Sequence, residues 1–199
     1  MYLETQRLLV RSLQPSDEKS FIEMASDGSL TEIFGDCSEC DKWMNDFIKE
    51  AMQLDLENNP CREYLAYAVE EKISKEVVGS VGTSFYEDFQ KTGVTYFIGA
   101  KFRGRGYAAE ALHALSEYFL ADGRVDLLMA TARTDNTASC KTLEKAGFRL
   151  TDTRPYQDLY DEQESLSHFY KKSPLDSGDY KNASHSPLKW FLLRQFPII

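Results

Sequence analysis

Hydrophobic and polar positions along this chain follow two periods, and the changes between them mark the expected elements. The early strand-like segments alternate apolar and polar residues or are rich in β-branched residues and glycine, and they cover residues 7–13, 63–70, 76–85 and 93–100. Segments of similar character later in the chain cover residues 125–133, 148–153 and 166–171. These segments are the expected strands of one sheet.

Helical periodicity fills the intervals between these strands. Apolar residues recur every three or four positions between Ser16 and Gly28, and again over residues 36–57. A third helix is expected to follow the glycines at 104 and 106, and a fourth to span 137–146, with Asn136 as its N-cap. The order predicts a mixed α/β fold, in which an antiparallel front is followed by a strand–helix–strand crossover.

The composition changes after residue 172. Residues 173–187 are polar and rich in residues that break helices and strands, above all Ser, Pro and Asp, which is typical of a linker, and the apolar stretch LKWFLLRQFPII follows. We therefore expect one domain over residues 1–172 and a polar linker with a short apolar tail over 173–199. The tail is too short to span a bilayer, and it could pack on its own domain, on a partner subunit or on a membrane surface.

Composition and charge narrow the expected partners. Hydrophobic residues make up 42% of the chain, which is enough for a core, and the net charge of −9 disfavours nucleic acid and favours a cationic ligand. No apolar run is long enough for a membrane span, and the opening MYLETQRLLV does not resemble a secretion signal. We expect a cytoplasmic protein with no membrane span.

The four cysteines are expected to be free thiols. Cys37 and Cys40 form a C-x-x-C pair, but neither a second such pair nor a closely spaced histidine pair completes a zinc site. We therefore expect no metal, and we interpret Cys37 and Cys40 as small residues on the buried face of a helix.

A glycine-rich segment, GAKFRGRGYAA from Gly99 to Ala109, joins an expected strand to an expected helix. Such a turn directs unpaired backbone N–H groups and the positive end of the helix dipole toward one point, which suits a pyrophosphate. Gly104 and Gly106 would allow positive φ angles and close approach of a ligand. The segment lacks the G-K-S/T of a P-loop, and no opening βαβ unit supports a dinucleotide fold. By itself it also fits an ordinary tight turn.

A second motif lies about thirty residues downstream, where Asn136 and Ser139 precede LEKAGF at 143–148. Together, RGRGYAAEA and NTASCKTLEKAGF resemble the GNAT superfamily of acetyl-CoA-dependent N-acetyltransferases. They are most similar to the branch of ribosomal-protein N-terminal acetyltransferases, whose opening the segment ETQRLLVR (residues 4–11) also resembles. The resemblance covers residues 3–171. It implies a mostly antiparallel central sheet, splayed at the fourth strand, with helices on both faces.

The resemblance also implies which residues bind the acetyl donor. Backbone amides that would hold the coenzyme A pyrophosphate belong to Arg103, Gly104, Arg105, Gly106, Tyr107 and Ala108. The pantetheine arm would pair with the strand edge, as another strand does, at Ile98, Gly99 and Ala100. Asn136 and Ser139 would contact the same arm.

The resemblance implies a catalytic hydroxyl as well. Many family members carry a tyrosine, which protonates the leaving thiolate, at the position of Leu143, and this chain departs from that pattern. The ribosomal-protein branch has a serine three residues after the asparagine, which is Ser139 here. A hydroxyl can donate a hydrogen bond to the sulfur as charge develops, so Ser139 is the catalytic candidate. The alternative is a small hydroxyl in the first turn of a helix.

The implied reaction is direct attack of a primary amine on the thioester of acetyl-CoA in a ternary complex. The amine would be a protein N-terminus or a small amine, and it must be neutral, which for a lysine-like amine costs about 4.6 kcal/mol at pH 7. Candidates for a base that border the acceptor groove are Glu87, Asp88, Tyr96 and His168. Leu143 favours the alternative, a family member that binds coenzyme A without turnover. A homodimer formed through the tail is also left open.

Overall fold

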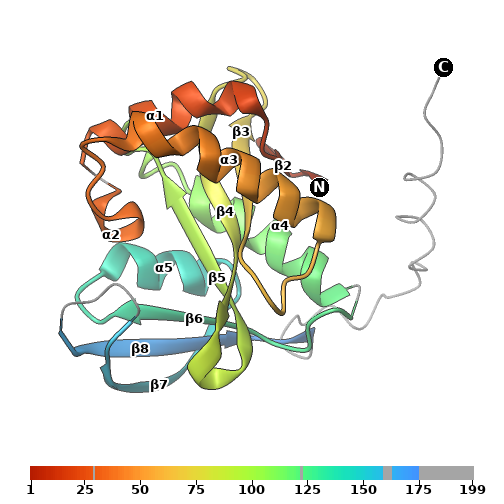
Figure 1. The fold of residues 1–199 in the computed structure, drawn as a ribbon. Helices are drawn as coiled ribbons and strands as arrows, with labels where there is room; N and C mark the ends of the chain where they lie inside the picture. The colour runs from red at the N-terminus through yellow and green to blue at the C-terminus, as the bar shows by residue number, and fades with distance from the viewer. Residues whose placement is uncertain (29, 122, 159–162, 175–199) are drawn as a thin grey trace.

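The computed structural model describes residues 1–28, 30–121, 123–158 and 163–174 (Figure 1). The linker and tail expected from residue 173 therefore lie, beyond Pro174, outside the described residues. The strands are β1 (Tyr2–Glu4), β2 (Leu8–Ser12), β3 (Leu65–Glu71), β4 (Val77–Tyr86), β5 (Lys91–Ile98), β6 (Leu128–Arg133), β7 (Arg149–Tyr156) and β8 (Ser165–Lys172). Within the described ranges they form one eight-stranded sheet in the order β1-β2-β3-β4-β5-β6-β8-β7.

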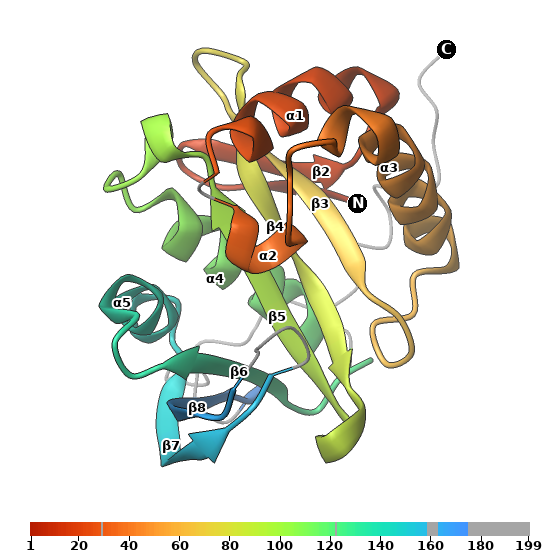
Figure 2. The same cartoon turned by 60° about the vertical axis from the view of Figure 1, so that its left-hand side comes forward.

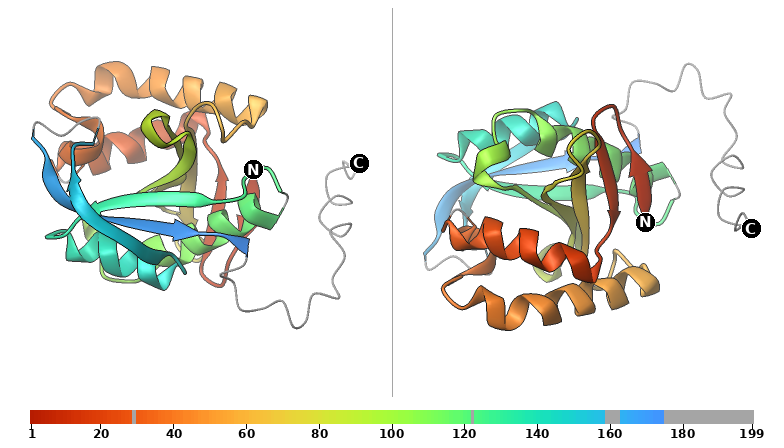
Figure 3. Two further views of the ribbon diagram at one scale, coloured as in Figure 1. Left: turned by 90° about the horizontal axis from the view of Figure 1, so that it is seen from below. Right: turned by 90° about the horizontal axis from the view of Figure 1, so that it is seen from above.

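Helices cover both faces of this sheet. They are α1 (Glu18–Ser26), α2 (Thr31–Phe34), α3 (Cys40–Glu57), α4 (Tyr107–Ala121) and α5 (Thr137–Lys145). Short 3-10 turns are η1 (Pro15–Asp17), η2 (Glu87–Phe89) and η3 (Ala100–Phe102). In Figure 3, α1, α2 and α3 lie on one face and α4 and α5 on the other.

Each face of the sheet has its own hydrophobic core. On the α4 and α5 side, Leu112, Phe119 and Leu143 are fully buried. On the other side, the apolar stripe of α3 is buried against α1 and the sheet. Its buried members are Cys40, Met44, Ile48 and Ala51, at the three- and four-residue spacing that the sequence predicts.

Cys37 and Cys40 belong to this second core. Both are free and buried, with Cys37 just before α3 and Cys40 as its first residue. Burial raises the pKa of the Cys37 thiol, with smaller contributions from Cys40 and Asp36. The predicted burial of both residues is therefore confirmed, but only Cys40 lies on a helix, because α3 begins three residues after Cys37.

The strand directions agree with the predicted topology. The pairs from β1 to β5 are antiparallel, β5 and β6 are parallel across the crossover helix α4, and β8 pairs antiparallel with both β6 and β7. The predicted mixed α/β fold is thus confirmed. Two elements are additional to the prediction, β1 and α2, which have three and four residues.

The sheet opens between β5 and β6. Strand β5 pairs with β4 over its whole length, but it pairs with β6 only at Thr92 and Gly93. Beyond Gly93 the two strands diverge, as Figure 2 shows. This strand is the fourth one expected from the sequence, so the predicted splay is confirmed.

Candidate functional site

The turn between β5 and α4 has the conformation that its glycines make possible. Gly104 has a φ of +76° and Gly106 a φ of +80°, in the left-handed region that side chains with a Cβ rarely adopt. The chain passes through η3 and these two glycines before α4 begins at Tyr107. The backbone conformation of the turn therefore favours glycine at both positions.

Several backbone N–H groups in this turn have no hydrogen-bond acceptor within the described residues. Over the described part of the chain, no acceptor faces the N–H groups of Gly104, Arg105, Gly106, Tyr107 and Ala108. The helical pattern starts with the N–H of Glu110, which donates to the carbonyl of Gly106 at 3.2 Å. Unpaired N–H groups at the positive end of a helix form a site suited to an anion such as a pyrophosphate.

The open edge of β5 leads directly to this turn. The N–H of Gly99 donates to Val78 on β4 at 3.0 Å, so the alternation of an antiparallel pair directs the backbone groups of Ile98 and Tyr96 away from β4. The side chain of Arg103 donates to the Ile98 carbonyl at 2.9 Å. A strand-like ligand that paired with Ile98 would have to displace Arg103.

Thr5 and Arg7, which lie between β1 and β2, contact Glu110 and the turn, and these three residues form a brace on the turn. Glu110, in the first turn of α4, accepts hydrogen bonds from the Thr5 hydroxyl at 2.6 Å, from the Arg7 backbone N–H at 2.8 Å and from Arg7 Nε at 2.7 Å. Arg7 Nη1 also donates to the carbonyl of Arg105 at 2.8 Å. The guanidinium lies 4.9 Å from the centre of the Tyr107 ring. Arg7 thus contacts the turn and the helix that follows it.

The electrostatics of this brace favour an ionised carboxylate. Burial opposes ionisation of Glu110, but the hydrogen bonds from Thr5 and Arg7 outweigh it and hold the pKa of Glu110 below its ordinary value. Glu110 and Arg7 each lie in a motif of the sequence, RGRGYAAEA and ETQRLLVR, but no local pattern indicates their contact, because the two residues are 103 positions apart.

Asn136 and Ser139 lie at the start of α5. Asn136 caps the helix, because its Oδ1 accepts the backbone N–H of Ser139 at 3.1 Å. The cap engages the side-chain oxygen and leaves the amide NH₂ to donate elsewhere. The capping role that the sequence predicts is confirmed, while contact with a ligand stays a prediction.

The Ser139 hydroxyl contacts a side chain from the open strand. Its Oγ lies 2.6 Å from the hydroxyl oxygen of Tyr96, which also lies 3.3 Å from the Ser139 carbonyl oxygen. Burial raises the pKa of Tyr96 to about 12, although the Ser139 hydrogen bond lowers it. Leu143 is fully buried in the core, so its position offers no group to the site.

The other base candidates lie apart from this hydroxyl pair. His168 is on β8, beyond β6 from β5, and its Nδ1 lies 2.7 Å from the Thr153 hydroxyl. Glu87 and Asp88 are exposed in η2, at the tip of the β4–β5 hairpin. Of the four candidates, the structure brings only Tyr96 to Ser139.

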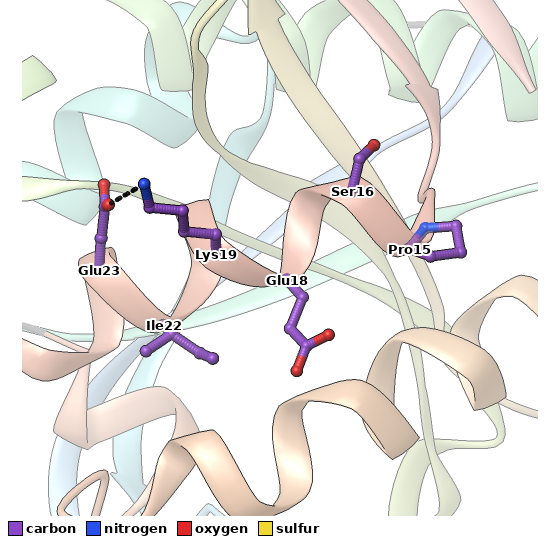
Figure 4. A pocket seen from close by; sticks show the side chains of 6 residues that line it. All are labelled: Pro15, Ser16, Glu18, Lys19, Ile22 and Glu23. Atoms are coloured by element: carbon purple, nitrogen blue, oxygen red, sulfur yellow. Dashed lines mark ion pairs between the residues drawn. The ribbon is translucent and has the colours of Figure 1, made fainter.

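Two surface hollows lie away from Tyr96 and Ser139. A hollow of about 620 Å³ runs beside α1, and Figure 4 shows its wall from Pro15 to Glu23, with an ion pair of 3.8 Å between Lys19 and Glu23. It has no convergent polar groups that would mark a ligand site. A second hollow of about 590 Å³ lies between α1 and the strand ends and borders Gly99 to Phe102. Neither includes Tyr96 or Ser139.

The described residues contain neither a metal-binding cluster nor a membrane-spanning helix. Among the residues that the structure describes, no group of three or more His, Cys, Asp or Glu side chains is arranged to hold a metal ion. In the same residues, no helix has both the length and the apolar character needed to cross a membrane.

Comparison with known proteins points to one family. A family model described as an acetyltransferase (GNAT) domain matches residues 7–149. YjdG of Bacillus subtilis strain 168, named an uncharacterised N-acetyltransferase, is 30% identical over 116 residues, which cover 55% of this chain and 68% of YjdG.

Solved structures share the fold. An acetyltransferase of the GNAT family from Bacillus anthracis superposes with a TM-score of 0.71 at 21% identity, over 87% of this chain and 98% of that one. The ribosomal-protein acetyltransferase RimL, solved in complex with coenzyme A, superposes with a TM-score of 0.69 at 13% identity, again over 87% and 98%.

Proposed function

Because this chain belongs to the GNAT acetyltransferase family, we propose that it transfers the acetyl group of acetyl-CoA to a primary amine, by direct attack in a ternary complex. The acceptor is a protein N-terminus or a small amine. The observation that carries the proposal is the turn from Gly104 to Ala108, whose backbone N–H groups have no acceptor among the described residues and lie at the end of an open strand.

In this proposal each part of the site has one task. The turn from Arg103 to Ala108 binds the pyrophosphate of the acetyl donor through the backbone N–H groups of Gly104 to Ala108 and the α4 dipole, because the Arg103 N–H donates to the Ala100 carbonyl at 3.3 Å. The open edge at Ile98, Gly99 and Ala100 pairs with the pantetheine arm, and Asn136 contacts that arm from α5. RimL, which shares the fold, was solved with coenzyme A, and this supports the choice of ligand.

The reaction places the acceptor amine against the thioester carbonyl. The amine nitrogen forms a bond to the acetyl carbon, the carbon–sulfur bond breaks and its electron pair stays on sulfur. Ser139 hydrogen-bonds the sulfur as this charge develops. The net charge of −9 favours a cationic acceptor, and an N-terminal α-amine, with a pKa near ~7.7–8.0, would be the least costly to deprotonate.

A second candidate function is coenzyme A binding without turnover. Leu143 favours it, because a core residue occupies the position where the resemblance predicts a tyrosine acid. Release of free thiol from acetyl-CoA, measured with a panel of peptide N-termini, polyamines and aminoglycosides, separates the two. Acceptor-dependent release supports the enzyme. Tight coenzyme A binding by calorimetry, with no release above background, would contradict it.

A further inference from the structure

Two hydroxyl groups bridge the opening in the sheet. Tyr96 comes from β5, beyond the last residue that pairs with β6, and Ser139 comes from the first turn of α5. Their hydroxyl oxygens are 2.6 Å apart. Both residues are partly exposed, so a ligand that enters the opening can reach them.

The geometry allows the Tyr96 hydroxyl to be the donor in this contact. Two hydroxyls in contact share one proton along the line between them. The Tyr96 oxygen also lies 3.3 Å from the Ser139 carbonyl oxygen, which can only accept, so both acceptors within its reach belong to Ser139. A phenol is also the more acidic of the two groups. When Tyr96 donates its O–H to Ser139 Oγ, the Ser139 proton is free to turn toward a third atom.

We propose that Tyr96 is a positioning residue for acetyl transfer, which donates its O–H to Ser139 and thereby directs the Ser139 proton at the sulfur of the departing thiolate. This inference rests on the proposed function. During the step, the C–N bond forms, the C–S bond breaks, and the extra proton on nitrogen leaves to water. Ser139 hydrogen-bonds the sulfur anion and keeps its proton.

Two observations support this role. The Tyr96 phenol is neutral near pH 7 and can donate, and burial, which raises its pKa to about 12, keeps it a donor at more alkaline pH as well. Leu143 is buried in the core, so α5 offers no hydroxyl at that position. Strand β5 supplies a hydroxyl instead, that of Tyr96, which is 43 positions from Ser139 in the chain.

The test compares Tyr96→Phe, Ser139→Ala and the double variant in an acceptor-dependent thiol-release assay. Tyr96→Phe removes only the hydroxyl, and we expect kcat to fall about tenfold, the effect of one lost hydrogen bond, while the KM for acetyl-CoA changes less than about twofold. Because Tyr96 acts through Ser139, the double variant should have the kcat of Ser139→Ala alone. Ser139→Thr keeps a hydroxyl and should retain most of the activity.

Tyr67→Phe is the matched control. Tyr67 is a buried tyrosine on β3, separated from β5 by β4, and the variant should leave kcat unchanged. Circular dichroism and coenzyme A calorimetry check that each variant is folded and binds the donor.

Several results would overturn the inference. Wild-type kcat in Tyr96→Phe would remove Tyr96 from the reaction while leaving the proposed function in place. Losses that multiply in the double variant would show that the two hydroxyls act independently. A wild-type protein that binds coenzyme A but shows no acceptor-dependent thiol release would contradict both the inference and the proposed function.

Discussion

Gly106 shows how much one residue contributes to the turn. Its φ of +80° would cost any residue with a Cβ about 1–2 kcal/mol, and more for a β-branched one. In Gly106→Val we expect the turn to rearrange and its N–H groups to point elsewhere, so that calorimetry finds coenzyme A affinity at least tenfold weaker.

The matched control is Gly123→Val. Gly123 has a φ of +72° and lies outside the turn, with no neighbouring atom within 4 Å of an added Cβ. It should lose stability to the same kind of strain and keep its affinity for coenzyme A. Unchanged affinity in Gly106→Val would contradict the assignment of the turn.

Glu110 should make stability depend on pH in the acid range. Its pKa in the fold is held below the ordinary value of ~4.3, so its contribution is complete above that value and is lost as the pH falls through the folded pKa. We expect the free energy of unfolding of the wild type to exceed that of Glu110→Gln at pH 7, and the difference to shrink below pH ~4.

Denaturant unfolding of both proteins over a pH series measures this difference. Glu23→Gln, which changes an exposed glutamate on α1, is the control. A difference between the wild type and Glu110→Gln that stays constant from pH 7 to 3 would show that the carboxylate charge contributes nothing to the brace.

Features of the site that depend on neighbouring residues could be predicted from the sequence. Contacts between residues far apart in the chain could not. Periodicity predicted the long helices and strands, and a strand–glycine–helix pattern predicted Gly104 and Gly106, because neighbouring residues determine these features. The segments β1 and α2 are too short to show a period. The pairing of Tyr96 with Ser139 depends on how the β5–α4–β6 crossover places α5, which no local pattern records.

Arg7 contacts the glycine turn from the segment between β1 and β2. Removing its side chain should therefore weaken ligand binding at the turn, although Arg7 is not one of the residues assigned to the ligand. Arg7→Ala removes the guanidinium that donates to Glu110 and to the Arg105 carbonyl, while the Arg7 backbone N–H and the Thr5 hydroxyl still donate to Glu110. We expect coenzyme A affinity to fall about five- to tenfold, which corresponds to roughly one hydrogen bond, ~1 kcal/mol, since the guanidinium is partly exposed. Calorimetry measures the change.

Arg62→Ala is the control for this prediction. Arg62 has an exposed side chain and lies 3.9 Å from Glu63 in a surface ion pair. Its removal should leave the affinity unchanged. Equal losses in the two variants would attribute the effect of Arg7 to overall positive charge.

At the scale of the whole molecule, Lys172 joins the last strand to both helices on its face. Its ammonium is buried, donates to the Ser116 hydroxyl at 2.7 Å and to the Ala146 carbonyl at 2.8 Å, and pairs with Glu117 at 2.8 Å. Lys172→Met leaves these partners without a donor, and we expect the free energy of unfolding to fall by about 2–4 kcal/mol. Chemical denaturation measures it.

A truncation after Pro174 keeps Lys172 and is the companion experiment. It should unfold at the wild-type denaturant concentration, because β8 and its contacts are complete. Ultracentrifugation of the same protein tests the dimer: if a wild-type dimer becomes a monomer, the residues removed belong to the interface. Loss of the folded core would contradict a domain that ends at residue 172.

The brief pairing of β5 with β6 has a mechanical meaning. The part of the sheet from β1 to β5 pairs with the part from β6 to β7 at Thr92 and Gly93. Beyond these residues β5 and β6 are not paired. A molecule that lies along the free edge of β5 would serve as a temporary stitch between these parts. Each cycle of ligand binding and release would then join and separate the two parts of the sheet, so that the rigidity of the protein would increase on binding and decrease on release.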